Sequence, residues 1–290
     1  MAEYFANVQV AAAPGSAAKP PEDWAHASAE LVVVLDGATA RTDTGCVHGV
    51  QWYAARLGTA LLDLAGDPRA ELVDALRGAI ERVAGEHSTT CDLSHPGTPS
   101  AGVAILRPDG RYLVLGDVTI AADGSKGPVV VVDPRVEQTA KAERAEVDRH
   151  LIGTPEKAAA LIPMKRAELA ARNVAGGYWI AAADPSAATH ALTGRISASG
   201  RVAVLTDGAA RAVTLGLMDW STLLDVITHA GPAEVIARVR AAEAADPLGA
   251  RWPRNKASDD ATAVAVTRSI QASRNGEESP LNRGQWEGSA

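Results

Sequence analysis

The sequence predicts an α+β protein built on antiparallel β-sheets. Strand-like apolar runs come in groups, helical stretches come in groups between them, and the two types do not alternate strictly. Residues 102–106 and 112–115 flank Pro108-Asp109-Gly110, a turn signal that indicates a hairpin and therefore antiparallel pairing. No linker-like stretch divides the chain, so we expect one domain over residues 1–270.

The first half of the chain contains strand signals followed by two helix signals. Residues 4–10 form an alternating run typical of a strand, and the continuous apolar run at 31–35 predicts a fully buried strand. Apolar residues then recur at helical spacing over 50–64 and again over 72–83. These two stretches predict amphipathic helices, which Gly66-Asp67-Pro68 separates.

The second half repeats this mixture around a charged segment. Residues 137–172 have a helical tendency, which Pro155 and Pro163 are expected to interrupt, and residues 137–175 form a candidate insertion or flap. The polar tail at 271–290 is predicted to be disordered. Further strands are predicted at 129–132, 178–182, 201–205 and 261–267, and further helices at 221–229 and 233–245.

Composition excludes several classes of function. The 290 residues are 47% hydrophobic and 22% charged, as in ordinary globular proteins, and the net charge of -7 gives no support to a nucleic-acid partner. No apolar stretch approaches the length of a membrane span, and the N-terminus lacks a signal-peptide pattern. Cys46 and Cys91 form no CxxC pair, so no disulfide framework is expected. We expect a soluble, cytoplasmic protein whose oligomeric state the sequence leaves open.

Acidic residues stand at the ends of several apolar runs. Asp36 closes LVVVLDG and Asp207 closes VAVLTDG, whereas Asp259 and Asp260 open the run SDDATAVAV. A buried strand that ends in an unpaired charge is unfavourable, because burial disfavours the ionised form. Several such strand ends meeting at divalent cations would remove that cost. The pattern therefore predicts a binuclear metal site on a β-rich scaffold.

An Asp-Gly pair is more often only a turn. In this chain Asp109-Gly110 and Asp123-Gly124 lie between strand-like runs and need nothing beyond turn chemistry. Asp36 and Asp207 are different, because the first leads into a polar loop and a helix and the second into helical sequence. Junctions of this kind at sheet edges are where functional sites are commonly built.

The order of these motifs resembles that of the metal-dependent serine/threonine protein phosphatases of the PPM (type 2C) family. The resemblance extends from about Pro20 to Thr267 and implies two antiparallel sheets packed face to face with helices on both outer sides, a four-layer α-β-β-α sandwich. It also implies two Mg²⁺ or Mn²⁺ ions at one edge. The motifs are PPED at 20–23, LVVVLDG at 31–37, TPSAGVAIL at 98–106 with YLVLGD at 112–117, VAVLTDG at 202–208 and SDDATAVAV at 258–266.

Carried over to this chain, the resemblance implies a set of metal ligands. Asp36 would bridge both ions, with the Gly37 carbonyl serving one of them. Glu22 would serve the second ion, and Asp207 and Asp259 would complete the first. Asp36 and Asp207 would thus be the central catalytic carboxylates. The chemistry agrees, because hard cations prefer carboxylate and carbonyl oxygens, and we find no His/Cys cluster in the sequence that would favour zinc. Two such ions lower the pKa of a bridging water and neutralise a phosphoryl group under attack.

The chain departs from the family pattern around these ligands. Ala38-Thr39-Ala40 follows the first Asp-Gly where the family has glycines, and Val118 follows Asp117 where it has serine. Asp260 stands where asparagine is usual. Asp23, Asp117 and Asp260 are candidates for a supporting role around the ligands.

Two departures concern charge. Arg211 occupies a position where many members have an aspartate for a third ion, and Ala18 replaces the arginine that grips phosphate. Lys19, Arg41 and Arg211 are candidates to bind phosphate instead, although each alone is more often a solvated surface charge.

The resemblance implies hydrolysis of phosphoserine or phosphothreonine in a phosphorylated protein substrate by metal-activated water. Two alternatives stay open. One is a PPM-like module that binds a partner or phosphoprotein with little or no turnover, which the departures suggest. The other is the same metal site acting on a small phosphorylated metabolite.

Overall fold

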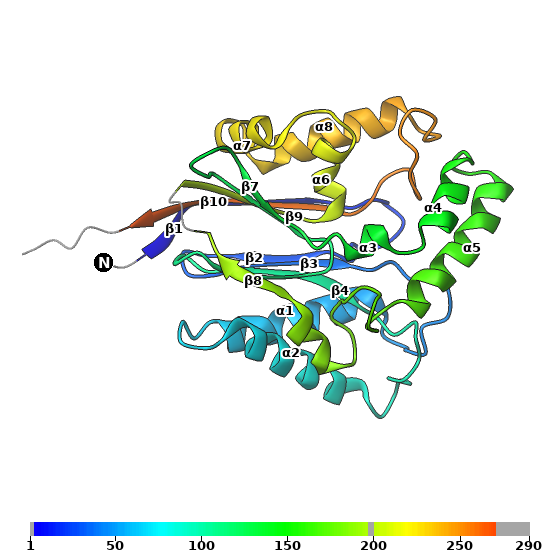
Figure 1. Cartoon of the computed structure of the whole chain (residues 1–290), viewed down its shortest axis with the longest axis horizontal. Coiled ribbons are helices and arrows are strands. Elements are labelled where there is room, and N and C mark those ends of the chain that lie inside the picture. The colour runs from blue at the N-terminus through cyan, green and yellow to red at the C-terminus, as the bar shows by residue number, and fades with distance from the viewer. Residues whose placement is uncertain (1–2, 197–199, 271–290) are drawn as a thin grey trace, which may run out of the picture.

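The computed structural model describes residues 3–196 and 200–270, and the tail predicted at 271–290 lies outside them. Within the described residues, two five-stranded antiparallel sheets pack face to face (Figure 1). Their strand orders are β1-β10-β9-β6-β7 and β2-β3-β4-β5-β8. The first sheet contains β1 (Glu3–Ala13), β10 (Ala261–Ile270), β9 (Gly200–Leu205), β6 (Thr119–Ala122) and β7 (Val129–Val131). The second contains β2 (Trp24–Ala27), β3 (Val32–Gly37), β4 (Ala101–Leu106), β5 (Arg111–Leu115) and β8 (Leu192–Arg195).

Helices cover both outer faces of this pair of sheets (Figure 1). On the second sheet lie α1 (Gly49–Ala65) and α2 (Leu72–His87), with the short 3₁₀ helix η1 (Pro185–His190) beside α2. On the first sheet lie α6 (Asp207–Thr214), α7 (Trp220–His229) and α8 (Pro232–Ala245). Three further helices, α3 (Arg135–Gln138), α4 (Lys141–Asp148) and α5 (Pro155–Ala170), lie at one end of the sandwich. The predicted α+β class and the four-layer α-β-β-α sandwich are confirmed.

Strand β3 illustrates why the central runs are continuously apolar. Successive side chains of a strand point to opposite faces. Val33 and Leu35 therefore pack against α1 and α2, whereas Val32 and Val34 pack into the layer between the two sheets. Both faces of β3 are covered, so every position from 32 to 35 is buried. The same register brings Asp36 opposite Gly102 on β4, at the end of the pairing.

The charged segment differs from its prediction at one proline. Pro155 begins α5, where its missing N–H costs little and Thr154 caps the helix by accepting a hydrogen bond from the Lys157 N–H. Pro163 was expected to interrupt the helix, but α5 runs through it to Ala170. The apolar side chains of Leu161 and Met164, on either side of Pro163, pack against Val147 of α4 and hold this part of α5 in place.

The strand predicted at 178–182 is also wrong. This segment makes only isolated bridges, between Ala101 and Ala181 and between Arg172 and Tyr178. The side chain of Asn173 accepts a hydrogen bond from the Ile180 N–H at 2.8 Å and donates one to the Ile180 carbonyl at 3.0 Å. These bonds satisfy the backbone that a neighbouring strand would otherwise pair. The short strands β2, β6 and β8 were not predicted.

Candidate functional site

The acidic residues at the strand ends meet at one cavity of about 510 Å³. Asp36 is the last residue but one of β3, and Asp117 lies in the connection between β5 and β6. Asp207 is the first residue of α6, directly after β9, and Asp259 lies just before β10. All four line the cavity, although Asp36 and Asp259 are more than two hundred residues apart in sequence. The antiparallel pairing of β9 with both β6 and β10 is what brings three of them together.

Asp36 and Asp207 contact one another directly. The backbone N–H of Asp207 donates a hydrogen bond to Asp36 Oδ2 at 2.9 Å, at the N-terminus of α6 where free N–H groups and the helix dipole favour an anion. Even so, burial and the negative charge of Asp207 raise the pKa of Asp36 well above its usual range. Burial and the charge of Asp259 raise the pKa of Asp207 to about 7. A divalent cation among these oxygens would reverse both effects.

The glycines after these two aspartates are required by close packing and not by a turn. A Cβ atom on Gly208 would lie 2.0 Å from the Asp260 carbonyl oxygen, and one on Gly37 would lie 2.4 Å from the Glu22 carbonyl oxygen. Gly110, in the control turn at Asp109, has φ of +86° and is closely packed as well, since a Cβ atom there would lie 2.2 Å from the Ile196 carbonyl oxygen. A left-handed backbone therefore distinguishes Gly110 from Gly37 and Gly208, whereas close packing is common to all three.

Asp260 positions the loop that contains Glu22. Its two carboxylate oxygens accept backbone hydrogen bonds from Gly15 at 2.7 Å and from Glu22 at 2.6 Å. The Glu22 carboxylate in turn accepts a hydrogen bond from Thr39 Oγ1 at 2.6 Å, and Thr39 lines the cavity. Asp260 thus acts on Glu22 through the backbone.

Asp23 lies behind the cavity, against the end of β9. Its carboxylate accepts a hydrogen bond from Thr206 Oγ1 at 2.9 Å, and Thr206 also accepts one from the Thr262 N–H. Burial raises the pKa of Asp23 to about 7, and the nearby charges of Asp260 and Asp259 act in the same direction. Asp23 therefore links the first acidic motif to the last two strands of the first sheet.

Two basic side chains already contact Asp259. Lys256 forms an ion pair with it, and Arg211 Nη2 lies 3.1 Å from its Oδ2. Arg211 also bonds Glu243 of α8 at 2.6 Å, and Glu243 is only 3% exposed. Lys256 donates a further hydrogen bond to Thr39 at 3.0 Å. The sequence analysis missed both Lys256 and Glu243. Lys256 lies only three residues before Asp259, a local signal that could have found it, whereas nothing local relates Glu243 to the site.

The three candidate phosphate-binding residues have different environments. Lys19 is exposed on the loop between β1 and β2 and is not among the residues that line the cavity, whereas Arg41 and Arg211 line it. Arg211 is engaged by Asp259 and Glu243. Arg41 has no ion-pair partner within residues 3–196 and 200–270, so its guanidinium is available to an anion.

The helical pair α4–α5 forms a wall of the same cavity. Arg144, Lys165 and Glu168 line it, and Arg144 pairs with Glu168 at 2.6 Å. This wall comes from the segment predicted as a flap at 137–175, and Figure 1 shows it at the end of the sandwich where β3 and β9 terminate.

None of the helices in the described part of the chain is long and apolar enough to span a membrane.

Comparison with known proteins supports the fold assignment. No family model matches the chain, and no curated protein matches it in sequence. Among solved structures, it is similar to the PPM Ser-Thr phosphatase MsPP from Mycobacterium smegmatis in complex with cacodylate, with 18% identity over 90% of this chain and 98% of that chain and a TM-score of 0.55. It is also similar to the Mycobacterium tuberculosis serine/threonine phosphatase PstP/Ppp, with 14% identity over 91% and 98% of the two chains and a TM-score of 0.57.

A third similar structure contains metal. It is the catalytic domain of the serine threonine protein phosphatase PstP in complex with two manganese ions, with 15% identity over 93% of this chain and all of that chain, and a TM-score of 0.55. At these identities the likeness defines the fold. The chain therefore has the fold of the PPM serine/threonine phosphatases.

Proposed function

We propose that this protein is a Mg²⁺- or Mn²⁺-dependent phosphatase that hydrolyses phosphoserine or phosphothreonine in a protein substrate. One observation supports the proposal above all others. Asp36, Asp117, Asp207 and Asp259 line a single cavity in a protein with the PPM phosphatase fold. Like charges so close together disfavour ionisation, and divalent cations remove that penalty.

The donor set fits two hard cations. Asp36, Asp207, Asp259 and the Gly37 carbonyl, which line the cavity, would hold them together with Glu22, which is joined to the cavity through Thr39. Mg²⁺ and Mn²⁺ prefer such carboxylate and carbonyl oxygens. Thr39, in the cavity wall, connects the two segments that contain these ligands. It donates a hydrogen bond to the Glu22 carboxylate and accepts one from the ammonium of Lys256, three residues before Asp259. When bound, such ions supply a water of low pKa and positive charge for the phosphoryl oxygens.

The remaining chemistry belongs to side chains of this chain. Arg41 is free to bind the phosphoryl group of the substrate, and Arg211 orients Asp259 through their ion pair. Asp207 keeps Asp36 in place through its backbone N–H. Asp260 fixes the position of Glu22, and the α4–α5 wall borders the space where a substrate side chain would enter.

A second candidate function has its own supporting observation. Asp259 is already neutralised by Lys256 and Arg211. If these cations compete successfully with a metal ion, the site keeps its shape and loses catalysis. The protein would then be a PPM-like module that binds a phosphorylated partner without turning it over.

The test is hydrolysis of an aryl phosphate and a phosphoserine peptide with Mn²⁺, before and after chelation. We expect turnover that needs Mn²⁺ and is lost in Asp36→Asn, and unchanged turnover in the control Asp74→Asn, whose side chain is exposed on α2. Activity that is indifferent to the metal or to Asp36→Asn contradicts the proposal. Calorimetric binding of Mn²⁺ without turnover of either substrate supports the second candidate.

A further inference from the structure

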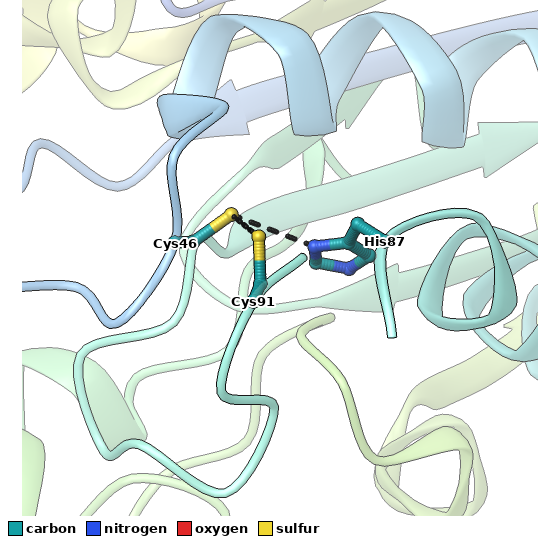
Figure 2. Close-up of side chains that lie close together, drawn as sticks. All are labelled: Cys46, His87 and Cys91. Atoms are coloured by element: carbon teal, nitrogen blue, oxygen red, sulfur yellow. Dashed lines mark hydrogen bonds between the residues drawn. The ribbon is translucent and has the colours of Figure 1, made fainter. Parts of the chain in front are cut away.

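A second group of metal-ligating side chains lies outside the carboxylate cavity. Cys46, His87 and Cys91 bring their ligand atoms within 4.8 Å of one another (Figure 2). Cys46 Sγ is 2.8 Å from Cys91 Sγ and 3.5 Å from His87 Nδ1. Figure 2 shows both sulfur atoms and the Nδ1 edge of the imidazole turned toward the same point. None of the three lines the carboxylate cavity.

The local backbone brings these residues together. His87 is the last residue of α2, and the Cys91 N–H donates a hydrogen bond to the His87 carbonyl at 3.0 Å, so one further helical turn separates them. Cys46 is on the loop that leads into α1. The Asp92 N–H fixes that loop by donating to the Gly45 carbonyl at 2.8 Å, and Gly45 has the φ of +64° that favours glycine. Two separate segments are thus held in register around the sulfur atoms.

The imidazole of His87 is almost completely buried and lacks ordinary partners. His87 is 1% exposed, and its Nε2 has no hydrogen-bond partner among the residues that the structure describes. Within residues 3–196 and 200–270, the hydrogen-bond partner of its Nδ1 is the Cys46 thiol alone, at 3.5 Å. A buried polar ring with so few partners is costly. A metal ion at the sulfur atoms would replace the weak thiol contact of Nδ1 with a strong bond, and the ring proton would then lie on Nε2.

We propose that Cys46, His87 and Cys91 bind a Zn²⁺ ion. Two thiolates and one imidazole are the donors that zinc selects, and the two thiolate charges balance the charge of the ion. The C-terminal end of α2, with its partial negative charge, also favours a cation at this point. A water molecule or the exposed His48, two residues after Cys46, supplies the fourth ligand. This site is independent of the proposed phosphatase function.

The sulfur–nitrogen distance fits zinc, whereas the sulfur–sulfur distance lies between the values for a disulfide, about 2.05 Å, and for two zinc-bound thiolates. With Zn–S bonds of about 2.3 Å and Zn–N bonds of about 2.0 Å, a tetrahedral ion separates sulfur from nitrogen by about 3.6 Å and two sulfurs by about 3.8 Å. The Cys46–His87 separation of 3.5 Å already matches the first value, and the sulfurs, at 2.8 Å, need to separate by about 1 Å. A disulfide would leave the buried His87 without its thiol partner at Nδ1 as well.

The site would join the loop at residues 38–48 to the end of α2. That loop begins directly after Asp36-Gly37 and contains Thr39 and Arg41, which line the carboxylate cavity. A zinc ion here would have a structural role, holding one wall of the cavity without contacting a substrate.

The first experiment measures metal in the full chain, purified without a metal-binding tag and dialysed against EDTA-free buffer. Elemental analysis should find one zinc per chain, falling to less than about a tenth in the double variant Cys46→Ser/Cys91→Ser. His87→Asn should lose zinc as well. The matched control His229→Asn, on an exposed histidine of α7, should keep it. Circular dichroism checks that each variant is folded.

A second measurement uses the unmutated protein and does not depend on any variant folding. Stripped protein titrated with Co²⁺ should develop a thiolate-to-cobalt charge-transfer absorption that saturates at one equivalent and disappears on adding Zn²⁺. Absence of that absorption overturns the proposal. So does an intact mass two hydrogens below the reduced value, the mark of a Cys46–Cys91 disulfide, or zinc content that is unchanged in the double serine variant.

Discussion

The carboxylate cavity and the sulfur–imidazole cluster of Cys46, His87 and Cys91 both gather cation ligands, but the two regions are built differently. The carboxylates come from the ends of strands that only the sheet pairing brings together. The cluster comes from one helical turn and one neighbouring loop. In the cavity, Arg211 and Lys256 already neutralise part of the negative charge. In the cluster, the described residues supply no comparable cation, and the buried His87 imidazole has no hydrogen-bond partner among them at Nε2.

The difference indicates which cation each region prefers and which property of the protein, function or stability, should change when that cation is removed. Hard oxygens favour Mg²⁺ or Mn²⁺, and thiolates with imidazole favour Zn²⁺. The basic residues at Asp259 offer the cavity an internal substitute for a metal, whereas the described part of the chain contains no cationic side chain paired with Cys46 or Cys91. Metal removal should therefore affect the function of the first region and the stability of the second.

The largest effects should appear when the two regions are altered separately. Asp36→Asn removes a carboxylate proposed to hold the metal ions, and we expect at least about a 100-fold loss of Mn²⁺-dependent turnover, because metal charge stabilisation is worth several kcal/mol. Its zinc content should stay unchanged. Cys46→Ser should give the opposite pattern, with loss of zinc and turnover within a few-fold of normal.

Turnover with an aryl phosphate and elemental analysis of zinc, measured on the same preparations, test this separation. If Asp36→Asn also loses zinc, or if Cys46→Ser loses turnover as completely as Asp36→Asn, then the two regions form one functional unit and the comparison fails.

Glycine substitutions test how tightly the acidic loops pack. Gly208→Ala places a methyl group 2.0 Å from the Asp260 carbonyl oxygen, so the α6 N-terminus must shift, and we expect about 2–3 kcal/mol of lost stability. Gly85→Ala in α2 is the matched control. Its new Cβ meets nothing within 4 Å, and the lower backbone entropy of alanine should stabilise the protein by about 0.5–1 kcal/mol. Urea unfolding measures both, and equal effects of the same sign would refute the packing argument.

The sequence was informative where the signal is local. Asp36 and Asp207 could be located because each ends an apolar run and precedes a glycine, and the helices 50–64 and 72–83 followed from their spacing. Long-range contacts were not accessible in this way. The ion pair of Arg211 with Asp259 depends on how α6 packs against the segment before β10, and that of Arg211 with Glu243 on how α6 packs against α8.

The zinc cluster was missed for a related reason. Cys46 and His87 are 41 residues apart, and only the pairing of two loops unites them. The one local signal was the spacing of His87 and Cys91, four residues apart just beyond the helix predicted at 72–83. That spacing would place a nitrogen and a sulfur ligand on one face if the helical path continued. Searches for CxxC or for two histidines at that spacing do not detect such a mixed pair.

Substitution of Arg211 tests, with a smaller expected effect, whether its ion pairs with Asp259 and Glu243 stabilise the metal-free protein. Arg211→Met leaves Glu243, which is only 3% exposed, with Arg240 as its remaining ion-pair partner. We expect about 2 kcal/mol of lost stability in metal-free protein, less than for a buried pair broken completely. Arg238→Met, which removes an exposed pair with Glu234, should change stability by less than about 0.5 kcal/mol. Similar urea midpoints for the two variants would mean that Arg211 has no special structural role.

Lys256 gives the smallest and most specific effect. Its ammonium pairs with Asp259 and also bonds Thr39, so a metal ion that binds Asp259 must displace it or bind beside it. Lys256→Ala should therefore tighten Mn²⁺ binding by about two- to five-fold, the range that a partly exposed ion pair is worth. Zinc binding should not change, and Lys126→Ala, in the exposed β6–β7 turn, should change neither. Calorimetry of Mn²⁺ binding measures the difference. Weaker binding in Lys256→Ala would show that Lys256 supports the metal site, and would remove the main observation in favour of a module without catalysis.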